Sequence, residues 1–116
     1  MPPGFLQSLK SELNEPLGVL MEWVREYKCF IYLTSVCNQP ISPSPLVDII
    51  WHHHLQHTLD YRNFCISTLN RMIYHSPSSA TTVEKKKEEI DSYKYTLELY
   101  KLMFRGEHNG IIWISP

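Results

Sequence analysis

Basic charge is scarce in this chain of 116 residues. The formal net charge is −1 when the histidines are counted as neutral. The stretch from Cys29 to Tyr61 contains no Lys or Arg, although it holds four of the six histidines. Because a nucleic-acid-binding surface needs clustered Lys and Arg, the sequence predicts no nucleic-acid partner.

Long apolar runs are also lacking, and cysteines are few. The apolar stretch from Cys29 to Cys37 is far shorter than the ~18–20 residues of a membrane span, and the first four residues have neither the basic flank nor the apolar core of a secretory signal. The three cysteines, Cys29, Cys37 and Cys65, are odd in number and form no Cys-x-x-Cys motif, which favours reduced thiols. We therefore expect an intracellular protein, in the cytoplasm or an organelle interior, that is neither secreted nor membrane-spanning.

Length and composition fit one helical domain over residues 1–116. Chains split into several domains only beyond roughly 250–300 residues, and the apolar fraction of 43% is close to that of ordinary globular domains. A helical pattern opens at Pro16, whose missing N–H is tolerated in a first helical turn, and ends near Cys37-Asn38. Its apolar positions recur every three or four residues: Leu17, Leu20, Met21, Val24, Tyr27, Ile31 and Tyr32.

A rigid loop from Gln39 to Pro45, with three prolines, precedes the next two helices. Ser44 is typical of an N-cap and Pro45 of the first helical position, and Asp48 in the first turn complements the helix dipole. Thr58 has the properties of another N-cap, so we expect a kink or short turn near His57. The apolar face of the helix after that turn is expected at Leu59, Tyr61, Phe64, Cys65 and Leu69.

The last helix follows a loop at residues 76–80. Thr81 and Glu84 form a capping box at its start, and Gly106 is typical of a residue just past its end. The apolar tail 111–114 is expected to pack on the bundle. These signals predict an all-α fold, a compact bundle of about four helices with a short extra N-terminal helix. The inward positions expected in the last helix are Ile90, Tyr93, Leu97, Tyr100 and Phe104.

Histidines dominate the helix from Trp51 to His57. Histidine is a mediocre helix former, so four within seven positions are not explained by propensity. In a helix, His53 and His54 each share a face with His57, whereas His52 and His54 point to nearly opposite sides. A zinc ion needs three or four nitrogen or sulfur ligands, and two helices with a loop can supply them. The alternatives are buried histidines that form hydrogen bonds, and histidines that are solvated.

Cys65 is the cysteine nearest to this cluster in the sequence. A Cys-His nucleophile pair would need a thiolate and a third group that orients the imidazole. Asp48 and Asp60 are the candidate orienting groups. The competing interpretation is a buried structural thiol.

The segment 47–54 resembles a signature of the glycine-rich-domain-containing-protein-like family, which is named after plant proteins and has bacterial and fungal members. The family pattern is an Asp, then Trp-His-x-His, a Tyr seven residues after the second His, and a Cys four residues further on. The segments 42–45, 74–77 and 93–104 and the terminal Trp113 also resemble the family, so the similarity covers about residues 22–114. The residues that match the pattern are Asp48, Trp51, His52, His54, Tyr61 and Cys65.

The resemblance also implies a set of metal ligands. His53 and His57 are not part of it, because they occupy positions at which the family pattern specifies no residue. One ion would reach both His52 and His54 only where the helix breaks, because a regular helix directs them apart. The larger relatives add glycine-rich and other domains, and the resemblance implies no particular reaction. For a single zinc ion, if any cofactor is bound, the implied ligands are His52, His54, Cys65 and His75, with Asp48, Trp51 and Tyr61 as structural motif residues.

We therefore interpret the chain as a small helical interaction or scaffold module with a protein partner, such as a subunit of a larger assembly. The aromatic-rich helices, the apolar tail and the lack of a catalytic signature favour this interpretation over an enzyme. The alternative is a metal-dependent enzyme that uses the His/Cys cluster. We also expect Trp51 to be buried between its own helix and the last one. For His52 and His54 the sequence leaves two alternatives open: burial as neutral groups or as ligands, or exposure to solvent.

Overall fold

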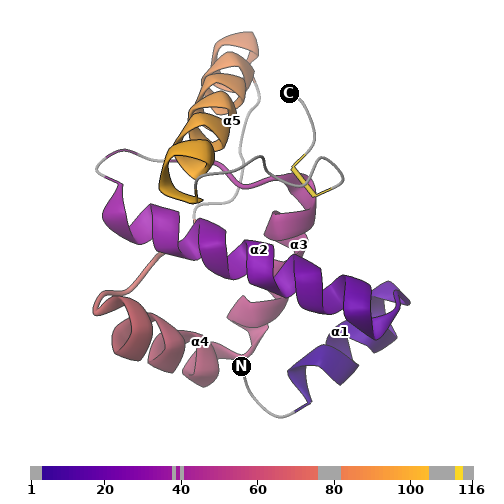
Figure 1. The fold of residues 1–116 in the computed structure, drawn as a ribbon. Helices are drawn as coiled ribbons and strands as arrows, with labels where there is room; N and C mark the ends of the chain where they lie inside the picture. Colours follow the sequence, from indigo (N-terminus) through magenta and orange to yellow (C-terminus); the bar gives the residue numbers. More distant parts are fainter. Residues whose placement is uncertain (1–3, 38, 40, 76–81, 105–111, 114–116) are drawn as a thin grey trace.

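Helix α2 (Leu17–Val36) crosses the middle of the molecule and contacts α1 (Phe5–Leu13), α3 (Pro45–Gln56) and α5 (Val83–Phe104) (Figure 1). Helix α4 (Thr58–Phe64) follows α3 and continues into a π-helical turn, η1 (Cys65–Leu69). The computed structural model describes residues 4–37, 39, 41–75, 82–104 and 112–113. All regular elements in these ranges are helical, which confirms the predicted all-α fold.

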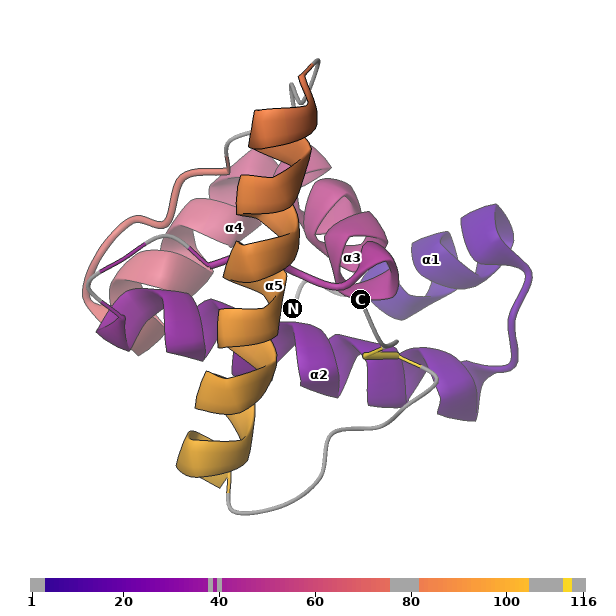
Figure 2. The same cartoon turned by 90° about the horizontal axis from the view of Figure 1, so that it is seen from above.

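The helices lie on two sides of α2. Helix α5 lies across one side, and both of its ends extend past α2 (Figure 2). Helices α1 and α4 lie on the opposite side (Figure 1). None of the helices in the described ranges is both long and apolar enough to cross a membrane.

The start of α3 agrees with the sequence prediction. The Ser44 hydroxyl accepts a hydrogen bond from the Val47 N–H at 3.2 Å, Pro45 is the first helical residue, and Asp48 lies in the first turn. A side-chain oxygen at this position satisfies an N–H that has no partner within the helix. The cap therefore fixes where the histidine-bearing helix begins.

The break after α3 lies at His57. Its backbone, with φ −92° and ψ 68°, ends α3 and precedes α4, so a short turn separates two helices as predicted. The predicted N-cap at Thr58 is wrong by one residue, because Thr58 is already helical. The Thr58 hydroxyl instead donates back to the Leu55 carbonyl at 3.4 Å.

The start of α5 also differs by one residue from the prediction. The Thr82 hydroxyl accepts a hydrogen bond from the Lys85 N–H at 3.1 Å, so Thr82 is the residue that caps the helix at Val83. With the cap there, Glu84 is not three residues after it, as a capping box requires. The predicted cap Thr81, the loop 76–80 and the predicted helix end at Gly106 lie outside the described residues.

The inner faces of α2 and α5 are narrower than the periodicity predicted. In α5, Tyr93 and Tyr100 are buried and Leu97 is half-buried, but Ile90 and Phe104 are exposed. Ile90 lies in the N-terminal part of α5, which extends past α2 (Figure 2), whereas the Phe104 ring lies 6.4 Å from the exposed Tyr32 ring of α2. The other predicted core positions that prove to be exposed are Leu17, Met21 and Tyr32 in α2 and Leu59 in α4, whereas Leu20, Val24, Tyr27 and Ile31 in α2 and Tyr61 and Cys65 after the turn are buried.

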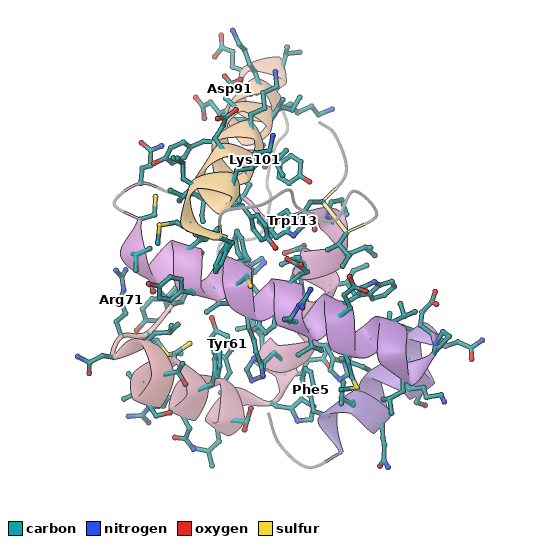
Figure 3. All side chains as sticks on the ribbon, viewed as in Figure 1. Phe5, Tyr61, Arg71, Asp91, Lys101 and Trp113 are labelled. Atoms are coloured by element: carbon teal, nitrogen blue, oxygen red, sulfur yellow. The ribbon has the colours of Figure 1, made fainter. Side chains whose placement is uncertain are left out.

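The C-terminal segment packs on the bundle at Ile112 and Trp113, both buried, as the sequence predicted for this tail. Figure 3 shows Trp113 between α5 and α2. Its indole N–H donates to Glu26 Oε2 at 3.0 Å, and the Tyr100 hydroxyl donates to the same oxygen at 2.6 Å. Burial raises the pKa of Tyr100, so this hydroxyl keeps its proton and remains a donor. The buried carboxylate of α2 thus joins α5 and the tail to the centre of the fold.

Candidate functional site

The neighbouring histidines of α3 point to opposite sides of the helix. The His52 side chain is 53% exposed, whereas His54 is completely buried. This divergence is expected for residues two positions apart on a helix. Of the two alternatives that the sequence left open, exposure holds for His52 and burial for His54, because the side of α3 that faces α2 and α4 is the His54 side.

His54 connects three helices through both of its ring nitrogens. The Tyr27 hydroxyl of α2 lies 2.6 Å from Nδ1, and Asp60 Oδ2 of α4 lies 2.8 Å from Nε2. Burial raises the pKa of Tyr27, which keeps the phenol protonated, and burial lowers the pKa of His54, an effect that the Asp60 hydrogen bond opposes. These partners assign the neutral tautomer in which Tyr27 donates to Nδ1 and Nε2–H donates to the Asp60 carboxylate.

The Tyr27–His54–Asp60 chain has the order hydroxyl, imidazole, carboxylate that occurs in hydrolase triads. A nucleophile must reach its substrate, but Tyr27 is completely buried and its raised pKa disfavours the phenolate. These three hydrogen-bonded side chains therefore form a structural connection between α2, α3 and α4.

Trp51 is buried, as predicted, and forms a second connection. Its indole N–H donates to the Tyr61 hydroxyl at 3.0 Å, and that hydroxyl donates to the Ile73 carbonyl at 2.6 Å. The rings that pack on Trp51 come from Phe30 of α2 and from His75, not from the last helix as expected. Tyr61 extends from α4 toward α2, on the side opposite Trp113 (Figure 3).

Cys65 is completely buried at the junction of α4 and η1, beside Tyr61. The two candidate orienting groups point elsewhere: Asp60 bonds His54, and Asp48 bonds His75. A substrate would reach this sulfur only after a rearrangement of the fold, so the geometry favours the structural interpretation of the thiol.

The exposed side of α3 carries a separate cluster, which we call the Asp48 cluster, formed by Asp48, His52 and His75. Asp48 Oδ1 lies 2.8 Å from His75 Nε2, and Asp48 Oδ2 lies 3.3 Å from His52 Nε2. One potential ligand atom from each of the three residues lies within 4.8 Å of the other two. This is the one such group of three or more histidine, cysteine or acidic side chains within the described ranges.

His53 lies on a third side of α3, against α1. Its Nδ1 is 2.6 Å from Glu12 Oε2, and its ring is 5.5 Å from that of His57, so these two histidines share a face as predicted. The Phe5 ring of α1 packs on both of them. This pair gathers no third histidine or cysteine among the described residues and attaches α1 to α3.

The structure brings together two of the four ligands implied by the resemblance. His52 and His75 meet in the Asp48 cluster, whereas His54 and Cys65 lie in the buried interior. The third member, Asp48, is predicted from the sequence to complement the helix dipole, to belong to the structural motif or to orient a histidine, but not to be a metal ligand. The signal that could have identified it is its position four residues before His52, which places both side chains on one face of a helix.

A groove of mixed polar and apolar lining, which we call the α2/α5 groove, lies between the C-terminal end of α2 and α5. Its volume is about 520 Å³. The Cys37 thiol approaches the Tyr95 hydroxyl at 3.8 Å across the groove. None of the lining side chains is charged: Val36, Cys37, Gln39, Tyr95, Leu99 and Met103.

Comparison with known proteins places this chain in a family. The UCP032817-like family model matches residues 6–101, a range that includes α1 except its first residue, α2 to α4, and most of α5. The glycine-rich domain-containing protein 1 of Arabidopsis thaliana is 28% identical over 102 residues, which cover 83% of this chain and 12% of that relative. No solved structure matches the chain. Because the family model covers most of the chain and all motif residues lie within it, the chain belongs to the UCP032817-like family, and its resemblance to the glycine-rich-domain-containing proteins is confirmed.

Proposed function

We propose that this domain is a protein-interaction module that binds an apolar helical segment of a partner in the α2/α5 groove. The observation that carries the proposal is a neutral groove between two helices, with exposed apolar side chains at its edge. Val36 and Met103 both line the groove and are exposed. Isolated exposed apolar residues are ordinary, but a contiguous apolar patch marks an interaction site.

The shape of the surface favours a helix as the occupant. An amphipathic helix binds a groove through apolar side chains at i, i+3, i+4 and i+7. The apolar surface continues along both helices beyond the groove, where the exposed Tyr32 ring lies 6.4 Å from that of Phe104. Met103 adds an unbranched, adaptable side chain of the kind that is common at peptide-binding surfaces.

The surroundings of the motif residues agree with this role. His54, Trp51 and Tyr61 are occupied in hydrogen bonds between helices, so the motif maintains the fold and leaves the groove for a ligand. The chain spans 12% of the length of its curated relative, which fits a domain that works as one module within a longer protein.

The test is selection of amphipathic helical peptides on the purified domain, followed by calorimetric titration. We expect peptides with an apolar face to bind, with amide shifts at Val36, Leu99 and Met103 in NMR spectra. Met103→Glu should weaken binding at least about tenfold, because an unpaired charge would be buried. Leu102→Glu is the matched control, since Leu102 is the preceding residue, is exposed, and does not line the groove.

Three results would contradict the proposal. The first is the absence of peptide binding at micromolar concentrations. The second is equal loss of binding in Met103→Glu and Leu102→Glu. The third is a concentration-dependent dimer that Met103→Glu dissociates, because the occupant would then be a second copy of this chain.

A further inference from the structure

Three side chains with nitrogen and oxygen donor atoms converge in the Asp48 cluster. Asp48 and His52 are four residues apart on α3, so they share one face of the helix, and His75 reaches the same point from the segment after η1. Both imidazoles direct Nε2 at the carboxylate of Asp48, one at each oxygen. The cluster is separate from the α2/α5 groove, which none of its members lines.

The distances are close to those of a metal site. Zinc ligands at about 2.0–2.2 Å in a tetrahedron lie roughly 3.3–3.6 Å from one another. The distance of 3.3 Å between His52 Nε2 and Asp48 Oδ2 falls in this range. All three donor atoms lie within 4.8 Å of one another. The distance of 2.8 Å between His75 Nε2 and Asp48 Oδ1 is that of a hydrogen bond, which an ion would replace.

The cluster combines a fixed side with an open side. The His75 side chain is only 8% exposed, whereas Asp48 is 37% exposed. The Trp51 ring packs edge-on against His75 with their centroids 4.3 Å apart, and the Tyr61 hydrogen bond to the Ile73 carbonyl fixes the chain two residues earlier. Solvent reaches the site past His52, so an ion can enter and water can complete its coordination.

The donor set selects the class of ion. Two imidazoles and one carboxylate suit divalent transition metals such as zinc, whereas Mg²⁺ and Ca²⁺ prefer oxygen ligands alone. Three protein ligands with a remaining position for water are also the arrangement of open zinc sites. We propose that Asp48, His52 and His75 bind one divalent transition-metal ion of the zinc class.

Binding of this ion joins α3 to the segment 73–75. An ion that binds only the folded chain stabilises it in proportion to the logarithm of its concentration over Kd. Tyr61 and Trp51 are positioning residues for the site, because they hold His75 and do not themselves provide ligands. Helix α3 thereby carries a buried structural connection at His54 and two of the three ligands, Asp48 and His52, on its exposed side.

The test uses the chain freed of metal by a chelator and titrated with Zn²⁺. We expect about one Zn²⁺ per chain in calorimetry and no comparable binding of Mg²⁺. Co²⁺ in place of Zn²⁺ should give visible absorption bands typical of tetrahedral nitrogen and oxygen ligands. His52→Gln and Asp48→Asn should each weaken Zn²⁺ binding at least about tenfold, since loss of a second-shell partner alone costs 10–100-fold.

His57→Gln is the matched control. His57 belongs to the same histidine run but lies outside the cluster, so its removal should leave the affinity for Zn²⁺ unchanged. If Asp48→Asn fails to fold, His52→Gln still tests the proposal, because the His52 side chain is exposed and its replacement should leave the fold intact. The proposal is overturned by wild-type affinity in His52→Gln, by equal weakening in His57→Gln, or by a chain that binds no Zn²⁺ and holds the cluster together by hydrogen bonds alone.

Discussion

Two histidines of α3, separated by one residue, have opposite surroundings. His54 is buried and bonded at both ring nitrogens, by Tyr27 of α2 and Asp60 of α4. His52 is exposed, and its Nε2 faces the carboxylate of Asp48. The difference shows that the position of an imidazole around the helix, and not the residue type, decides whether it joins helices or is accessible to a ligand.

The largest expected effect is that of Trp51→Ala, because Trp51 contacts both sides of this comparison. Its indole N–H bonds Tyr61 in the interior and its ring supports His75 in the exposed cluster. Loss of a buried Trp side chain should lower the free energy of unfolding by ~3–5 kcal/mol, a large share of the ~5–15 kcal/mol typical of a domain. Denaturant unfolding measures it.

Leu59→Ala is the control for this prediction. Leu59 is also a large apolar residue of the helical region, but it is 71% exposed. Its removal should change the free energy of unfolding by less than about 0.5 kcal/mol. Comparable losses in the two variants would mean that Trp51 does not occupy the interior described above.

Tyr27→Phe removes a hydrogen bond of the buried His54 and leaves the surroundings of the exposed His52 unchanged. The variant keeps the ring and removes the hydroxyl, so Nδ1 of the buried His54 loses its partner. The expected loss is about 1–3 kcal/mol in the free energy of unfolding. Tyr74→Phe, at a tyrosine that is 80% exposed, should be neutral by the same measurement. Equal effects of the two substitutions would show that the hydrogen bond to His54 contributes nothing.

Local signals in the sequence predicted much of the fold. Ser44 and Pro45 marked the start of α3 because a cap and a first-turn proline act through bonds within a few residues. The turn at His57 was located to within one residue for the same reason. Exposure along α5 was harder to predict, since Ile90 has the correct spacing but lies where α5 extends past α2.

The site was predicted only in part, because its geometry depends on tertiary contacts. The sequence showed that His52 and His54 diverge but not which of them faces the interior, a choice set by α2 and α4. The place of His75 beside Asp48 depends on the path of the chain after η1, which has no local signal. The burial of Glu26 was not predicted either, because its partners Tyr100 and Trp113 lie far along the chain.

The pH dependence of stability gives a further test of the difference between the buried His54 and the exposed His52. Burial lowers the pKa of His54, so below the unfolded value of about 6.5 the unfolded chain binds more protons than the folded chain. The contribution of this group is therefore complete above that pH and is lost as the pH falls toward the folded pKa, with a slope of at most about 1.4 kcal/mol per pH unit.

Denaturant unfolding in chelator at about pH 7.5 and 5.5 measures this slope in the wild type and in His54→Gln. The fall in stability toward acid pH should be smaller in the variant. If the free energy of unfolding fell equally with pH in both proteins, other groups would cause the pH dependence. His54 would then not be a buried, neutral histidine.

The smallest effect on stability is expected from Ser44→Ala. This substitution removes the N-cap of α3, so it destabilises the helix that carries both His52 and His54. Loss of the hydroxyl that accepts from Val47 should cost ~1 kcal/mol. The slope with pH should stay that of the wild type, because the Tyr27–His54–Asp60 chain is intact. The exposed Ser8 within α1 supplies the control, since Ser8→Ala should cause no loss of stability. A changed pH slope in Ser44→Ala would mean that the cap and the buried histidine are coupled.

The division of α3 into an interior side and a ligand side is tested most directly by the unfolding free energies of His54→Gln and His52→Gln, each measured in chelator and with excess Zn²⁺. In chelator, His54→Gln should lose about 1–3 kcal/mol and His52→Gln less than about 0.5 kcal/mol. Zn²⁺ should stabilise His54→Gln as it does the wild type and leave His52→Gln unchanged. Equal losses in chelator, or stabilisation of His52→Gln by Zn²⁺ to the wild-type extent, would contradict the division.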